Sequence, residues 1–100
     1  MAKPKNDTPI IELRNLGPAC EEQLNAVGIY TAGDIRKLGV EETFELTMRG
    51  RMQRGQGGHC FNAAYLYAIY GAINDIDWRE VPEKKKEQFK ALTKRLRDEL

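Results

Sequence analysis

The feature that most constrains this chain is the stretch from Cys60 to Ile73, CFNAAYLYAIYGAI, which contains no charged side chain. Apolar and small residues recur there at helical spacing on every side of the cylinder, a pattern typical of a helix that is buried on most of its surface. The run is too short to cross a bilayer, which takes about 20 apolar residues. We therefore expect a central helix on which the other segments pack.

The part of the chain before this helix has the signals of two short helices joined by a tight turn, over about 18–27 and 31–38. Gly28 follows the first helix, where a left-handed residue commonly ends an α-helix. Thr31 precedes the second helix, and Asp34 comes three residues later, which is the spacing of a capping box. The pattern predicts a helix-hairpin-helix-like N-terminal half.

Two further helices are expected, one on each side of the central one. The first runs from about Val40 to Gly50, and the glycine-rich segment from Gly50 to His59 should form a loop. The second begins at Pro82, and the single tryptophan, Trp78, should fill the gap between it and the central helix. The predicted fold is an all-α compact bundle of four to five helices. The apolar stripe of the last helix is Phe89, Leu92 and Leu96.

Length and composition indicate one soluble domain. The chain has 100 residues and a net charge of +1, so no overall field attracts it to nucleic acid or to a membrane. Residues 1–9 are polar and contain two prolines, which predicts a flexible N-terminal arm ahead of a single helical domain over 10–100. The N-terminus has no apolar signal region, which predicts a cytoplasmic location and two reduced cysteines, Cys20 and Cys60.

Catalysis and metal binding find little support. His59 and Cys60 are neighbours, but adjacent residues of a helix point about 100° apart and cannot act together as nucleophile and base. A structural zinc site needs four ligands, and the chain has one histidine and two cysteines. We expect no enzymatic activity, no metal, no cofactor and no small-molecule substrate.

Nucleic-acid binding is one of two roles that remain. Arg49, Arg51 and Arg54 lie in or beside the glycine-rich loop, and guanidinium groups suit phosphate recognition. The hairpin turn at Gly28 could add backbone amides, although a second glycine that would complete a G-x-G turn is absent. A solvated loop with incidental charge explains the same arginines.

Binding to a protein partner is the other role. Tyr67 and Trp78 are candidates for apolar surface left exposed beside the last helix. The near-zero net charge and the acidic residues interleaved among the lysines of the last helix favour this role over nucleic-acid binding. The clustered arginines favour the opposite choice.

Two sets of positions, taken together, are those of a known family. The first set is Leu13, Asn15, Leu16, Gly17, Pro18, Leu24, Gly28, Ile29, Thr31, Ile35, Leu38 and Gly39. The second set is Asn62, Tyr65, Ala68, Gly71, Ala72, Asp77, Trp78, Val81 and Pro82. In this order and spacing they resemble the C-terminal domain of TfoX (Sxy) proteins over about residues 11–90. The first set alone also resembles the hairpin unit of another bacterial domain, the C-terminal domain of RNA polymerase alpha.

The resemblance implies a helical domain to which no enzymatic activity is attributed. TfoX proteins are bacterial regulators of natural transformation competence, and they act with a cyclic-AMP receptor protein at competence promoters. Full-length members carry a different domain ahead of this one, so the present chain is expected to be a free-standing copy of the C-terminal half. The resemblance thus implies an interaction domain in transcription regulation that works through a protein partner.

Overall fold

The computed structural model of the chain describes residues 3–55 and 63–99. This part is all-α and has no sheet. Its only β-type pairing is an isolated bridge between Pro9 and Thr31. The elements, in chain order, are the 3-10 helix η1 (Ile10–Glu12), α1 (Pro18–Asn25), α2 (Ala32–Leu38), α3 (Val40–Gln53), α4 (Ala63–Asn74), the 3-10 helix η2 (Trp78–Glu80) and α5 (Glu83–Glu99).

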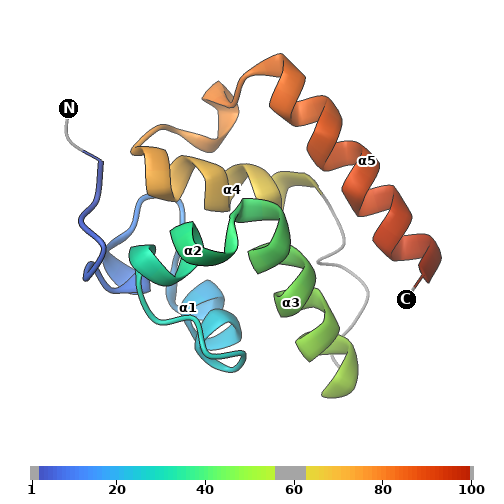
Figure 1. The fold of residues 1–100 in the computed structure, drawn as a ribbon, viewed down its shortest axis with the longest axis horizontal. Helices are drawn as coiled ribbons and strands as arrows, with labels where there is room; N and C mark the ends of the chain where they lie inside the picture. The colour runs from blue at the N-terminus through green and yellow to red at the C-terminus, as the bar shows by residue number, and fades with distance from the viewer. Residues whose placement is uncertain (1–2, 56–62, 100) are drawn as a thin grey trace.

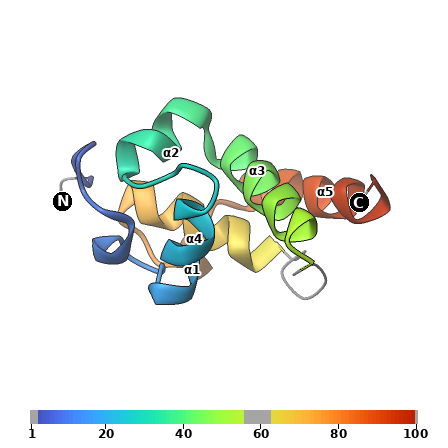
Figure 2. The same ribbon diagram turned by 90° about the horizontal axis from the view of Figure 1, so that it is seen from below.

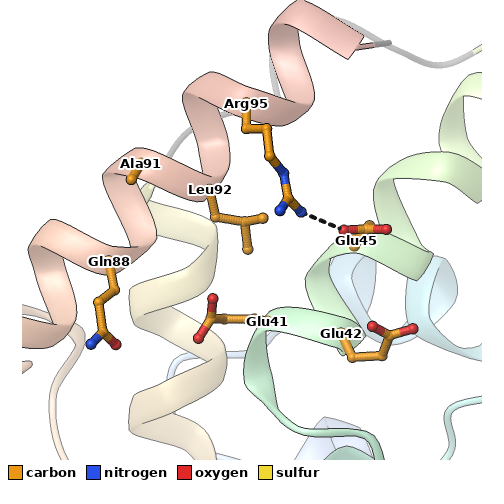
Figure 3. Close-up of a pocket in the computed structure, with 7 residues that line it drawn as sticks. All are labelled: Glu41, Glu42, Glu45, Gln88, Ala91, Leu92 and Arg95. Carbon is orange, nitrogen blue, oxygen red and sulfur yellow. Dashed lines mark hydrogen bonds and ion pairs between the residues drawn. The ribbon is translucent and has the colours of Figure 1, made fainter.

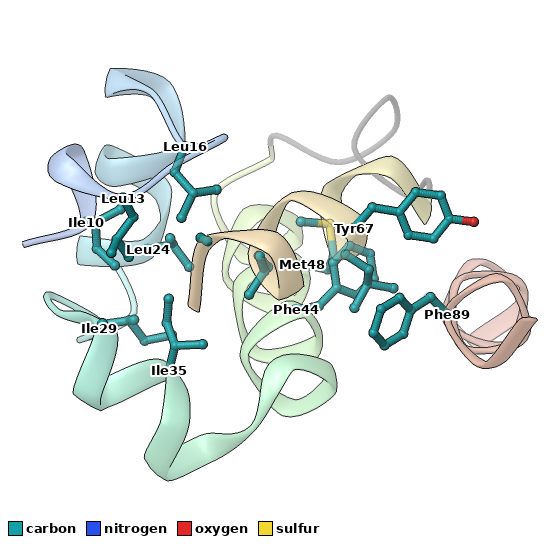
Figure 4. Packing of buried hydrophobic residues seen from close by; sticks show 14 of the residues in the cluster. Ile10, Leu13, Leu16, Leu24, Ile29, Ile35, Phe44, Met48, Tyr67 and Phe89 are labelled. Carbon is teal, nitrogen blue, oxygen red and sulfur yellow. The ribbon is translucent and has the colours of Figure 1, made fainter. Parts of the chain in front are cut away.

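Helix α4 is the centre of the fold, as the apolar run predicted. It contacts α2, α3, α5 and η2 (Figure 1). Leu66 and Ile69 are fully buried on it, and they lie in one continuous core with Leu24 and Ile35 from the N-terminal half and Phe89 from α5. Figure 4 shows this core, which extends on both sides of α4. None of the described helices combines the length and the hydrophobicity needed to cross a bilayer.

The C-terminal end of α4 is held by contacts from distant parts of the chain. Asp75 adopts a left-handed conformation with φ 55°, and the amide of Ile76 donates to the carbonyl of Gly71 at 3.0 Å, which closes the helix as a Schellman motif. Asn15, itself at φ 72°, donates its side-chain amide to the carbonyl of Ile76 at 3.0 Å. Arg36 donates to the carbonyl of Ile73 at 3.2 Å. Carbonyls that a helix end leaves unpaired are thereby satisfied.

The helical hairpin of the N-terminal half is confirmed. Gly28 has φ +84°, and Ile29 folds back into the core, where only 1% of its surface is exposed. Both hydrogen bonds of the capping box between Thr31 and Asp34 are present. Figure 2 shows α1 and α2 joined by this turn beside α4.

The predicted loop beginning at Gly50 is wrong for its first residues, because α3 continues to Gln53. Gly50 is buried in that helix, and a Cβ atom there would lie 2.5 Å from Cγ1 of Val27. The glycine therefore marks the close approach of α3 to the end of α1, and not a break in the helix. Sequence alone gives no means to distinguish the two uses of a glycine. His59 and Cys60 lie outside the described residues.

Trp78 does not fill the gap between α4 and α5, contrary to the prediction, since 42% of its surface is exposed on η2. Phe89 of α5 fills that gap instead. Its ring centroid lies 5.9 Å from that of Tyr70 in an edge-on arrangement and 6.1 Å from that of Tyr67. The three rings form the apolar contact that fixes α5 to the central helix.

The segment expected to be a flexible arm makes contacts along its described part. The carbonyl of Thr8 accepts a hydrogen bond from the amide of Ala32 at 3.0 Å, and the carbonyl of Asn6 accepts one from Gly33 at 2.8 Å. The side chain of Asn6 also accepts from Arg36 at 2.8 Å. The backbone before η1 thus lies against the first turn of α2.

Candidate functional site

The three arginines predicted to form one basic cluster are distributed over two sides of α3. Arg49 points toward α5, where its guanidinium lies 3.2 Å from Glu45 and 3.8 Å from Glu99. Arg51 lies on the side of α1, where it lines a small depression together with Glu22. Arg54 is the C-terminal cap residue of α3. Residues 49 and 51 are about 200° apart around a helix, so the side chains of Arg49 and Arg51 leave α3 on different sides.

The turn between α1 and α2 has no amide left over for an anion. The amides of Gly28 and Ile29 donate to carbonyls at the end of α1, at 3.0 Å each. Those of Tyr30 and Thr31 donate to Oδ2 of Asp34, at 2.9 and 3.2 Å. The carboxylate of Asp34 thus occupies the position in which a phosphate would have to accept these bonds.

Tyr67 and Trp78, the predicted partner-binding residues, do not lie on one surface. Tyr67 has 9% of its surface exposed and belongs to the core, where it contacts Phe89. Its hydroxyl is buried and has no hydrogen-bond partner among the described residues. Trp78 is exposed on η2, which follows the C-terminal end of α4.

The 3-10 turn that carries Trp78 is fixed by a local ion pair. Oδ1 of Asp77 accepts hydrogen bonds from the backbone amide of Arg79 at 2.8 Å and from its Nε at 2.9 Å. The side-chain hydrogen bond from Arg79, together with the backbone bond, lowers the pKa of Asp77 to about 2. Both groups are at the surface, so this contact orders the turn without adding much stability to the fold.

A hollow in the described surface lies between α3 and α5. It is a groove of about 510 Å³, open to solvent, with residues of α3 on one side and residues of α5 on the other (Figure 3). Leu92 is nearly buried and Ala91 is exposed, and these two side chains form its apolar part. We name it the α3/α5 groove. It is lined by Glu41, Glu42, Glu45, Gln88, Ala91, Leu92 and Arg95.

The charges of the α3/α5 groove are unequally distributed along its length. Glu45 accepts from Arg95 at 3.0 Å and from Arg49 at 3.2 Å, so its charge is compensated by two cations. Glu41 and Glu42 are exposed, and no described cation lies within ion-pair distance of either. One end of the groove is therefore balanced, and the other end is negative.

Sequence reasoning does not find this groove. From the sequence, Glu41 and Glu42 are explained as residues of the first turn of a helix, where they favour the helix dipole. Arg95 and Glu45 are 50 positions apart, and only the packing of α5 against α3 brings them together. The one sequence feature that points weakly to this groove is the presence of Glu41 and Glu42 in a segment whose net charge is otherwise positive. Within the described residues, no three histidine, cysteine or acidic side chains gather closely enough to hold a metal ion.

Comparison with known proteins gives one family and one related fold. The family model of the TfoX C-terminal domain matches residues 6–93. A crystal structure of an uncharacterized protein from Listeria monocytogenes superposes with a TM-score of 0.77 and 27% sequence identity, covering 90% of this chain and 94% of that one. A search of curated proteins finds no match.

Proposed function

Because the chain belongs to the TfoX C-terminal domain family, we propose that it is a non-enzymatic interaction domain that contacts a protein partner in transcription regulation. By analogy with TfoX (Sxy) regulators, the process is natural transformation competence in a bacterial cytoplasm. The regulatory effect then comes from the partner that the domain holds, and the domain itself carries out no chemistry.

The α3/α5 groove is the observation that carries this proposal. It combines a concave shape, an apolar part at Ala91 and Leu92, and charged groups on its rim. Protein interfaces have this composition, with an apolar centre surrounded by polar residues. Its two walls also belong to different parts of the chain, so the packed domain is required to form it.

The internal use of the predicted phosphate-binding groups supports a protein partner over nucleic acid. Arg49 is paired with Glu45 and Glu99, and the amides of the hairpin turn donate to acceptors within the chain. A phosphate would have to displace these contacts, and Asp34 would repel it. Direct binding through Arg49, Arg51 and Arg54 is the alternative.

Titration of a fluorescently labelled DNA duplex with the protein separates the two roles. The proposal predicts no saturable binding at near-physiological salt, and at low salt only a weak signal that the R49A/R51A/R54A variant reproduces. Micromolar binding that weakens steeply with salt, and whose salt dependence falls by roughly one unit of slope per arginine removed, would establish the alternative. Circular dichroism of the variant checks that α3 remains helical.

A further inference from the structure

We infer that the α3/α5 groove binds a basic amphipathic segment of the partner protein, with a cationic side chain at the Glu41–Glu42 end and an apolar side chain over Ala91 and Leu92. This inference rests on the proposed function and specifies the chemistry of its partner. It concerns one groove and one kind of occupant.

The charge of the groove selects a cationic occupant. Glu41 and Glu42 contribute two negative charges at the start of α3, and no described cation pairs with them. The N-terminus of a helix carries roughly half a positive charge, which offsets part of this. More than one negative charge therefore remains to be neutralised by whatever lies in the groove. An anionic occupant, such as a nucleic acid, would be repelled at the same place.

The size and lining of the groove select a peptide segment. A volume of about 510 Å³ accommodates a few side chains, which is the scale at which one face of a helix is recognised. Ala91 leaves an open position on α5 between Gln88 and Arg95, with Leu92 beside it (Figure 3). An apolar side chain can lie there while a lysine or arginine four residues along the occupant's helix reaches the acidic end.

A second copy of this chain does not supply such a segment from its described helices. The lysine-rich helix is α5, and its apolar residues Phe89 and Leu96 are already buried against its own domain. Only its outer, mixed-charge side is left, and that side contains Glu83 and Glu87 among the lysines. The occupant is therefore expected on another protein.

The test is the binding of two labelled synthetic helices of about 14 residues, measured by fluorescence anisotropy. Both have leucines on one face, and the opposite face carries lysines in one peptide and glutamates in the other. The lysine peptide should bind with a dissociation constant on the order of 10–100 μM, while the glutamate peptide should not bind. The E41Q/E42Q substitution should lower the affinity for the lysine peptide by about tenfold, as expected for the loss of two exposed ion pairs.

The matched control is E12Q/E80Q, which removes the same charge from η1 and η2, outside the groove. It should change the affinity by less than about twofold. Equal weakening by both double variants, or equal binding of the two peptides, overturns the inference. If the lysine peptide does not bind, but a cross-linker placed at position 91 still captures a partner from the native host, only the assigned chemistry of the occupant is overturned. If the lysine peptide does not bind and the cross-linker captures no partner, the groove is not an interaction site and the proposed function is overturned as well.

Discussion

Replacing Gly71 by alanine is expected to destabilise the domain by about 3 kcal/mol. In most helices this change is favourable by up to about 1 kcal/mol, since alanine is the better helix former. Here a Cβ atom would collide with the side-chain amide of Asn15 and with the carbonyl oxygen of Ile76. These two groups are hydrogen-bonded to each other and close the end of α4. The added methyl group must therefore displace the backbone at Ile76. A collision with the end of an exposed side chain would cost less, because such a side chain can rotate away.

Urea unfolding of the G71A variant measures this cost. G17A is the matched control, because nothing lies within 4 Å of a Cβ atom at Gly17, and alanine at this N-cap position should cost less than about 1 kcal/mol. Introducing G71A into an N15G background should cost less than it does in the wild type, because one of the two collisions is removed while the left-handed backbone of residue 15 is retained. An unfolding free energy of G71A equal to that of the wild type would show that Asn15 and Ile76 do not enclose α4 in this way.

Replacing Phe89 by alanine is expected to cost about 3–5 kcal/mol and to release α5 from the rest of the domain. Phe89 is 1% exposed, and its ring makes the edge-on and tilted contacts with Tyr70 and Tyr67 described above. Besides these rings, α5 is held by Leu92, Leu96 and surface ion pairs, and exposed ion pairs contribute little. The remaining contacts are expected to be too weak to keep a long charged helix docked.

Amide hydrogen exchange of the F89A variant provides the measurement. Protection should be lost throughout Glu83–Glu99 first, while the α1–α2 hairpin retains most of its protection. Phe89→Leu, which keeps most of the volume, should cost less than about 1.5 kcal/mol and preserve protection of α5. Uniform loss of protection across all helices in F89A would mean that α5 is not a separable unit and that the whole core depends on this ring.

The sequence predicted the elements of this fold well wherever the signal was local. The apolar rows of α4, the capping box at Thr31 and the left-handed turn at Gly28 depend on residues within a few positions of one another. The family resemblance was confirmed over almost the whole described chain. Several positions that carry this resemblance, Asn15 and Gly71 among them, have a packing role, and they identify the fold more directly than they identify a binding site.

The candidate site could not be predicted from the sequence, because it depends on contacts between distant segments. Whether Gly50 breaks a helix or lets α1 approach it is decided by Val27, which is 23 positions away along the chain. Whether Arg49 is available to a ligand is decided by Glu99, on a helix near the other end of the chain. The arginines were grouped because they are close together along the chain, but the helical geometry of α3 directs Arg49 toward α5 and Arg51 toward α1.

The same packing connects stability to the proposed function. The α3/α5 groove exists only while Phe89 keeps α5 beside α3, so a partner that binds both walls would add to the docking energy of α5. Partner binding should therefore raise the exchange protection of α5 more than that of the hairpin.

Whether the α3/α5 groove is the partner-binding surface can be decided by capturing the partner from the native host with tagged wild-type and variant proteins. The partner is identified and quantified by mass spectrometry. Two variants are compared, A91R, which places a cation in the groove at an exposed position, and R49A/R51A/R54A. A91R is expected to lose the partner that the wild type captures, and the triple arginine variant is expected to retain it. If A91R retains the partner while the arginine variant loses it, the interaction lies on Arg49, Arg51 and Arg54 and not in the α3/α5 groove.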